Sequence, residues 1–363
     1  MLKAFHGRAG FLTLPFLVYL SIHFGGVGPP VFIVMTYPNL LFTVLSFIGF
    51  LVCSVPLAAQ MKAGNIGACL SMTWSGLACL NQFINSIIWN DSVNNYAPVW
   101  CDISSRFIVG AAVAIPACSF CINQRLYRIV SLQMQGSSTK EKRLQIFADF
   151  LIGLGLPGLV IILQYVSQNG RYGIYQEIGC YPLTKNDALG NALVWAPVII
   201  IGCFSSVYTV LNLRTFFVAR PRIVQFLGGD RRPTLYFRLV IMTCVYGFCF
   251  VPLGVLSLYF HCAFSSTEVV GEWKANHAII SHVGREQWRN DPGLEASLEF
   301  GRWVVVAYAF ASSALFGLSE EVRTWYHLHF PFLATSFRFS WMERMGFRIV
   351  MSPSHDPEMT LSV

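Results

Sequence analysis

Residues 189–213 read LGNALVWAPVIIIGCFSSVYTVLNL, a run without a single charged side chain. The hydrocarbon core of a bilayer is about 30 Å thick, and a helix of about 20 mostly apolar residues crosses it. The run therefore predicts a transmembrane helix. It tolerates Pro197, because neighbouring helices in a membrane bundle can satisfy the carbonyl groups that a proline leaves without a donor.

Six further apolar runs share this character. They are residues 38–60, 66–89, 107–122, 147–166, 235–260 and 300–318. The third run is short, and it reaches spanning length only if its helix extends outward to Asp102 or inward to Leu126. We predict an all-α membrane protein, a seven-transmembrane helix bundle over residues 35–318.

The composition agrees with a chain that is partly solvated by lipid. Hydrophobic residues make up 55% of the sequence and charged residues 12%, against about 25% charged residues in a soluble domain. Five of the runs contain an internal proline, which predicts a bundle of bent helices: Pro56, Pro116, Pro157, Pro197 and Pro252. Pro252 is a candidate hinge, with a static kink as the alternative.

Lys and Arg are unevenly shared among the loops. If the amino end lies outside, the loops on the inner side, about 61–65, 123–146 and 214–234, carry 11 Lys and Arg. The outer loops are longer yet carry 5. Positive residues favour the cytoplasmic side. We therefore predict an N-terminus outside and a cytoplasmic C-terminus, an orientation that requires an odd number of spans.

The two ends of the chain lie outside the predicted bundle. Residues 1–34 contain an apolar stretch after Lys3 and Arg8 and resemble a signal sequence. They could equally be a spurious segment upstream of Met35, or an eighth, short span. Residues 319–363 are expected to form a short cytoplasmic tail.

The predicted spans lack the residues that several classes of membrane protein need. All six Lys lie outside them, which excludes a retinal Schiff base. Ionisable residues at membrane depth mark ion paths, and here the charged ones are few: Asp149, Arg106, Arg238 and Arg302, all near span ends. Without a P-loop or an HExxH motif, the sequence predicts no enzyme, no cofactor, no metal site and no nucleic-acid partner. A receptor fits best, and a seven-span transporter is the alternative.

Several short segments then resemble the fungal STE3-type pheromone receptors, the class D G-protein-coupled receptors. The resemblance covers about residues 36–320. The segments that carry it are WCDI at residues 100–103, NQRLY at 123–127, GRY at 170–172, EIGCYP at 177–182, NSIIW at 85–89 and GLP at 155–157.

This resemblance implies a plasma-membrane receptor that binds a lipidated peptide mating pheromone, farnesylated at its C-terminal Cys. The receptor would activate a heterotrimeric G protein through the alpha subunit. A receptor-like protein with a non-pheromone ligand remains a further alternative. The family usually begins close to its first span, so the leading 34 residues are extra.

Cys101 and Cys180 both fall on the predicted outer side, where a disulfide is permitted. Such a bridge would hold the second outer loop over the bundle. The alternatives are two free thiols, or a bond to Cys262. The distance between the Cα atoms decides, because more than about 7 Å cannot be bridged.

Six residues near the outer side are candidates for ligand contact: Asn85, Trp89, Asp102, Arg106, Tyr172 and Glu177. Asn85 could instead be a structural hydrogen-bonding residue between helices, and Trp89 could belong to the interfacial aromatic belt. Asp102 and Arg106 are four residues apart on a predicted helix, so they could form a surface ion pair.

Basic residues on the inner side are candidates for contact with the G protein. They are Arg125 and Arg128, with Tyr127 between them, and Arg220, Arg222, Arg231 and Arg232. The same residues explain the topology and could bind anionic membrane lipids, at about 1 kcal/mol per charge.

Overall fold

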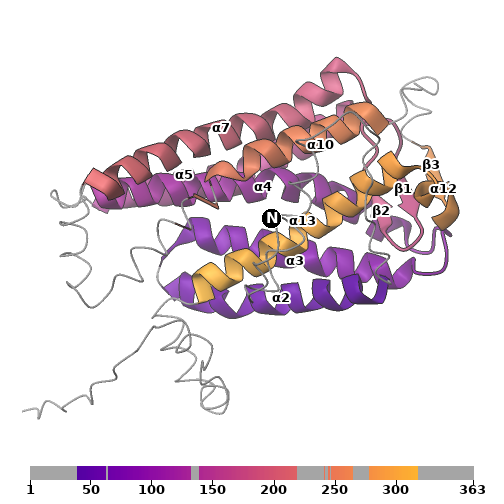
Figure 1. Ribbon diagram of the computed structural model, residues 1–363, viewed down its shortest axis with the longest axis horizontal. Helices are drawn as coiled ribbons and strands as arrows, with labels where there is room; N and C mark the ends of the chain where they lie inside the picture. The colour runs from indigo at the N-terminus through magenta and orange to yellow at the C-terminus, as the bar shows by residue number, and fades with distance from the viewer. Residues whose placement is uncertain are drawn as a thin grey trace, which may run out of the picture. The chain divides into compact units, whose positions relative to one another are not determined.

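The structure is a computed structural model, and it describes residues 39–62, 64–131, 139–218, 241, 244–245, 247–264 and 278–317. Long helices make up most of these residues, and a small β-sheet lies at one end of them (Figure 1). The predictions for residues 1–34, for residues 319–363 and for Arg220, Arg222, Arg231 and Arg232 lie outside the described residues.

Helices occupy each of the seven places where the sequence predicts a span. They are α2 (Asn39–Lys62), α3 (Ile66–Ile88), α4 (Pro98–Ser131), the consecutive α5 (Thr139–Phe150), η1 (Leu151–Gly155) and α6 (Leu156–Val166), then α7 (Ala188–Val218), α10 (Phe250–Phe264) and α13 (Pro292–Gly317). Five of these segments are long and apolar enough to cross a membrane. The two others are α3, whose 23 residues include several amide side chains, and α10, of which 15 residues are described.

The third and seventh helices are longer than the sequence predicts. α4 starts at Pro98 and ends at Ser131, well beyond both ends of the apolar run 107–122. α13 starts at Pro292, before the predicted residue 300. An apolar run shows only the part of a helix that lies in lipid. The helix itself continues into polar sequence until the unpaired N–H and C=O groups at its ends find other hydrogen-bond partners.

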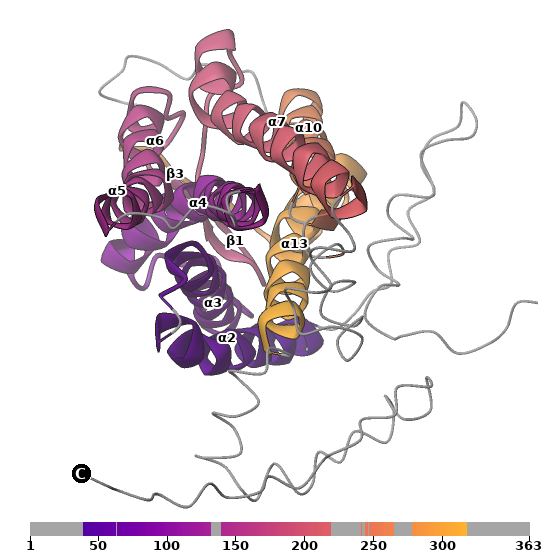
Figure 2. The same ribbon diagram turned by 90° about the vertical axis from the view of Figure 1, so that its left-hand side faces the viewer.

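α4 is the central helix of the bundle. Of the residues in its apolar window, 72% are buried, against 22–39% in the other four candidate spans. A view along the helices places α4 in the middle, with α3, α6, α7 and α13 around it (Figure 2). Its small residues, such as Ala114, Ala117 and Ser119, are fully buried, which allows the neighbouring helices to approach closely.

Large apolar side chains cover the outside of the helices. Leu159 and Ile162 on α6 and Ile200, Phe204 and Val207 on α7 are each more than half exposed. A soluble domain would leave such a continuous apolar surface in contact with water, at a high cost in free energy. The surface therefore agrees with helices that are surrounded by lipid.

Pro157 explains an irregular turn in the fourth helical segment. A proline has no N–H and cannot donate to the carbonyl four residues earlier, which here is that of Gly153. The Trp74 indole Nε1 on α3 donates to this carbonyl oxygen at 3.0 Å. The chain forms the π-helical turn η1 at this place. The proline thus creates an acceptor that a side chain on another helix satisfies.

Three short strands form the sheet. β1 (Tyr172–Tyr175) pairs antiparallel with β2 (Gly179–Tyr181), and β3 (Ile280–Val283) pairs parallel with β1. The strand order is β2-β1-β3. The short helix α12 (Arg285–Arg289) follows β3. We call the end of the bundle that carries this sheet the capped end, and the opposite end, where α4 finishes, the Arg125 end.

Candidate functional site

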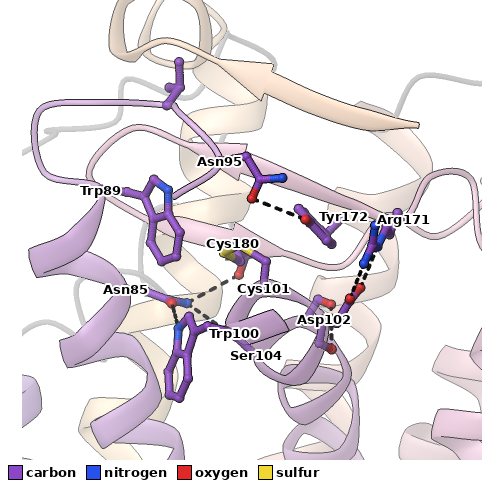
Figure 3. Close-up of a disulfide and its surroundings, with 12 residues drawn as sticks. Asn85, Trp89, Asn95, Trp100, Cys101, Asp102, Ser104, Arg171, Tyr172 and Cys180 are labelled. Carbon is purple, nitrogen blue, oxygen red and sulfur yellow. Dashed lines mark hydrogen bonds and ion pairs between the residues drawn. A yellow bond between two sulfur atoms is a disulfide. The ribbon is translucent and has the colours of Figure 1, made fainter. Parts of the chain in front are cut away.

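A disulfide ties the sheet to the central helix. Cys101, in the first turn of α4, is bonded to Cys180 on β2, and their Cα atoms are 5.1 Å apart (Figure 3). Both residues are fully buried against Trp89 and Tyr172. Cys262, the competing partner, is an exposed free thiol on α10. The bond thus fixes the hairpin of β1 and β2 over the capped end of α4.

Asn85, near the end of α3, contacts the hairpin at Gly179 and Cys180. Its side-chain oxygen accepts a hydrogen bond from Trp100 Nε1 at 2.8 Å, and its Nδ2 donates to Ser104 Oγ at 2.9 Å (Figure 3). Its relative exposure is 1%. Gly179 lies directly on Asn85 with φ +91°, and a Cβ on Gly179 would meet Asn85 Cβ at 2.5 Å. The structure thus uses Asn85 for packing and hydrogen bonds within the bundle.

Trp89 and Tyr172 are buried in the same cluster. Both have 0% relative exposure, so Trp89 does not face lipid as an aromatic-belt residue, and that alternative is wrong. Trp89 Nε1 donates to the Asn94 carbonyl at 3.0 Å, and the Tyr172 hydroxyl donates to Asn95 Oδ1 at 3.3 Å. These bonds attach the segment between α3 and α4 to the sheet.

Asp102 does not form the predicted pair with Arg106. Its carboxylate instead accepts two hydrogen bonds from Arg171, from Nε at 2.9 Å and from Nη2 at 2.5 Å (Figure 3). Arg106 donates to Gln168 Oε1 at 3.4 Å. A bidentate guanidinium–carboxylate pair is stronger than a single contact between neighbouring turns. The hydrogen bond to Asp102 raises the pKa of Arg171.

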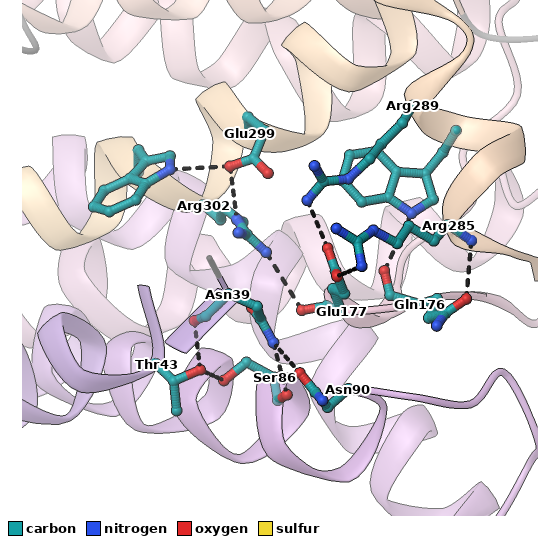
Figure 4. Close-up of polar contacts among 12 residues, drawn as sticks. Asn39, Thr43, Ser86, Asn90, Gln176, Glu177, Arg285, Arg289, Glu299 and Arg302 are labelled. Carbon is teal, nitrogen blue, oxygen red and sulfur yellow. Dashed lines mark hydrogen bonds and ion pairs between the residues drawn. The ribbon is translucent and has the colours of Figure 1, made fainter. Parts of the chain in front are cut away.

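Glu177 lies in the turn of the hairpin between β1 and β2. It has φ 71°, uncommon for a residue with a side chain, and 5% relative exposure. Its carboxylate pairs with Arg289 at 2.6 Å and with Arg285 at 3.1 Å (Figure 4). The ion pairs therefore join the hairpin to α12, more than a hundred residues later in the chain.

The backbone of Glu177 makes two further contacts. Its N–H donates to the Trp89 carbonyl at 2.8 Å. Its own carbonyl accepts from Arg302 Nη1 at 3.3 Å (Figure 4). Arg302 is 5% exposed and also donates to Glu299 at 2.9 Å. One residue thus connects α3, the hairpin, α12 and α13.

Polar side chains also connect α4 and α7 near the Arg125 end. Asn123 Nδ2 donates to Ser205 Oγ at 2.9 Å, and Asn212 Nδ2 donates to the Asn123 carbonyl at 3.0 Å. Arg125 Nη1 donates to the Gly64 carbonyl at 2.8 Å, which joins α4 to the turn between α2 and α3. Tyr127 packs its ring on Tyr208, and Arg128 is exposed.

The sixth helical segment is broken just before Pro252. α10 begins at Phe250 after a bend at Cys249, and Pro252 in its first turn has no N–H to donate to the carbonyl of Phe248, four residues earlier. On the other side of the bend, Gly247 packs so closely on Thr209 that a Cβ would lie 1.5 Å from its Oγ1. Ser206 Oγ donates to the Gly247 carbonyl at 2.8 Å.

The family model described as STE3, pheromone A receptor, matches residues 41–334. The chain belongs to this family. The match covers every helix and strand of the capped bundle except the first two residues of α2.

The STE3-family chain has several curated relatives. It is 35% identical to the Pheromone B alpha 3 receptor of Schizophyllum commune over 293 residues, which are 79% of this chain and 46% of the relative. It is 30% identical to Pheromone receptor 1 of Ustilago hordei over 292 residues, 78% of this chain and 81% of the relative. The Pheromone a factor receptor of Saccharomyces cerevisiae is 25% identical over 301 residues, 80% of this chain and 60% of the relative. The chain spans about half the length of the first curated relatives that it matches.

Family membership settles several points that the residues left open. STE3 proteins are multi-pass receptors of the plasma membrane, and the family implies seven spans, in agreement with the seven helical places. They are not enzymes, in line with the lack of a catalytic motif in the sequence.

Three arginines that hold the capped end together are not among the site residues predicted from the sequence. Arg285, Arg289 and Arg302 contact Glu177, yet nothing in their local sequence marks them. The sequence marks Arg302 only as a charge near a span end. Their partner is more than a hundred positions away, so no spacing rule could have found these contacts.

Proposed function

We propose that this chain is a G-protein-coupled receptor for a farnesylated peptide mating pheromone. The observation that carries the proposal is the family match, which extends over the whole helical bundle and its sheet. The names of the relatives refer to pheromone reception throughout. This favours a receptor over the transporter that the apolar runs alone would allow.

The capped end is proposed to face the outside of the cell. Three observations support this orientation. The loops of the Arg125 end carry more Lys and Arg, as cytoplasmic loops do. The Cys101–Cys180 disulfide lies at the capped end, and disulfides persist in oxidising surroundings. Asn39, the first residue of α2, donates to the Ser86 carbonyl, next to Asn85, which contacts β2, so the amino end of α2 lies on the side of the sheet.

The candidate ligand residues divide into two groups by exposure. Asp102 and Arg106 are partly exposed at the capped end, and we assign them direct contact with the peptide. Asn85, Trp89, Tyr172 and Glu177 are buried and hydrogen-bonded inside the cap. We assign these four an indirect role, in which they give the cap the shape that the ligand meets.

The Arg125 end is proposed to bind the G protein alpha subunit. Arg125 and Tyr127 are partly exposed and Arg128 is exposed, so their side chains can reach a partner. Arg220, Arg222, Arg231 and Arg232 are proposed to contribute from the loop between α7 and the sixth segment. The break before Pro252 is the proposed hinge, because a receptor needs an element with two arrangements that a ligand can bias.

A fungal reporter strain without its own pheromone receptors tests this function. The chain is expressed with a surface tag and challenged with a panel of farnesylated peptides, with the same peptides without the lipid as the matched control. A response to a farnesylated peptide alone supports the proposal. Silence across the panel, with the protein at the cell surface, contradicts it and favours a ligand of another kind.

Arg125→Ala separates binding from signalling in the same strain. We expect peptide binding at the surface to stay near the wild-type level and the reporter response to be lost, because Arg125 lies at the far end from the cap. Arg143→Ala, which removes an exposed charge on α5, is the matched control. An unchanged response in Arg125→Ala would refute its assignment to the G-protein site.

A further inference from the structure

Tyr308 lies where three helices meet inside the bundle. It belongs to α13, and its hydroxyl oxygen is 2.7 Å from Ser71 Oγ on α3 and 3.1 Å from Ser119 Oγ on α4. Both serines have 0% relative exposure. Figure 2 shows α3 and α13 as neighbours of the central α4. One phenol group therefore bridges three helices in apolar surroundings.

The protons of these hydroxyls can be assigned from their partners. Each hydroxyl donates one proton. Ser119 Oγ lies 2.9 Å from the Ile115 carbonyl, which can only accept, so Ser119 donates there. Tyr308 then donates to Ser119 and accepts from Ser71. The result is a directed chain from α3 through α13 to α4 in which each of the three protons has an acceptor.

The ring of Tyr308 reaches the break in the sixth segment. Its centroid is 5.7 Å from that of Phe250, and Phe250 is 7% exposed. Phe250 is the first residue of α10, directly after the bend at Cys249 and two positions before Pro252. A change in the bend would therefore move Phe250 against a ring that is held by α3 and α4.

The residues before the bend at Cys249 show how the sixth segment packs on α7 while Tyr308 contacts Phe250. Gly247 lies against Thr209, and the Gly247 carbonyl accepts from Ser206 on α7. α7 and the sixth segment are therefore packed together beyond the bend. A G protein that enters between helices at the Arg125 end would need these two segments to separate.

We propose that Tyr308 is a positioning residue which couples the bend before Pro252 to α3 and α4 and favours the closed packing of Gly247 on Thr209. Its hydroxyl anchors the ring, and the ring limits the movement of Phe250. The effect on signalling rests on the proposed receptor function. The effect on the movement of the sixth segment does not.

Tyr308→Phe removes the hydroxyl and keeps the ring. With the anchor lost, the sixth segment separates from α7 more easily. We expect ligand-free signalling in the reporter strain to rise about 5-fold at equal surface level, as for the loss of one net hydrogen bond that favours the closed arrangement. Ligand potency should rise in parallel, because less ligand binding energy is needed to shift the population.

Thr43→Val is the matched control. The Thr43 hydroxyl also bridges two helices, at 2.9 Å from Ser86 Oγ, but it lies between α2 and α3 at the capped end. A merely structural role for Tyr308 predicts the same outcome for both variants. Ligand-free signalling that stays at the wild-type level in Tyr308→Phe, or rises equally in Thr43→Val, would overturn the proposal.

Two additions keep the test decisive. If Tyr308→Phe fails to reach the surface, Ser119→Ala breaks the same chain one bond further on, and the same rise is expected. Hydrogen–deuterium exchange of the purified receptor in nanodiscs gives a readout without ligand or G protein. Faster exchange of residues 247–253 in Tyr308→Phe than in Thr43→Val supports the coupling, and equal exchange refutes it. A wild-type chain that never signals while this difference is present would contradict the proposed function alone.

Discussion

The capped end joins its parts with full charges and a disulfide, whereas the contacts that join helices around Tyr308 use hydroxyl groups. At the cap, Arg285 and Asp102 are partly open to solvent, and the buried Glu177 carboxylate is paired with two arginines, so each of these charges keeps either water or a charged partner. Inside the bundle, a charge would have to leave water for a surrounding of low dielectric constant, at a cost that a hydroxyl avoids. Ion pairs and a disulfide thus hold the cap together, whereas weaker hydroxyl hydrogen bonds join the helices around Tyr308.

This difference makes clear which variants should unfold the protein and which should only retune it. Loss of a contact at the cap frees a whole loop or exposes a buried charge. Loss of a hydroxyl contact inside the bundle shifts the balance between two packed arrangements by about 1 kcal/mol. Tyr308→Phe covers the hydroxyl contacts, and three further variants, two at the cap and one inside the bundle, cover loss of stability, beginning with the largest effect.

Cys101→Ser should have the largest effect. The disulfide closes a loop of 79 residues, and removal of a native disulfide costs about 2–5 kcal/mol. We expect most of the receptor to be lost from the cell surface, as measured by an external tag and flow cytometry. Cys262→Ser, which changes an exposed free thiol near the same end, should stay at the wild-type level. Equal surface levels for the two variants would mean that the disulfide does not hold the cap.

Glu177→Gln should have a smaller effect that is still confined to the cap. The change leaves Arg289 and Arg285 without their carboxylate, and a hydrogen bond to a charged group contributes about 1.5–3 kcal/mol. The unfolding temperature of the purified receptor should fall. The matched control is Glu286→Gln, which changes an exposed carboxylate on α12, the helix that carries Arg285 and Arg289. If both variants melt alike, the ion pairs of Glu177 do not stabilise the cap.

Trp74→Phe should have the smallest effect of the three. It removes the donor to the Gly153 carbonyl, at a cost of about 1–3 kcal/mol for an unsatisfied buried group. Pro157→Ala restores a backbone N–H that can reach this carbonyl. The two changes together should therefore destabilise the receptor by less than the sum of the single changes, in thermal unfolding of all three variants. Strict additivity would show that the proline and the indole are not coupled.

Prediction from the sequence succeeds where the property is local. Apolar length locates the helices, because each stretch of chain meets lipid independently of its neighbours in space. Spacing puts Asp102 and Arg106 on one helix face, but a partner from another loop, Arg171, takes the carboxylate. The place of Glu177 in the second outer loop suggests contact with a ligand, whereas in the structure two arginines surround its carboxylate.

The sequence by itself determined the helical membrane class, the places of the seven helical segments and the segments that mark the STE3 family. These follow from composition, from the length of apolar runs and from short motifs, which do not depend on how the chain is packed. Only the tertiary structure decided that Trp74 satisfies the carbonyl left by Pro157, that Arg289 meets Glu177, and that Tyr308 joins Ser71 to Ser119. Each of these contacts joins residues far apart in the chain, and burial decides which groups must find a partner.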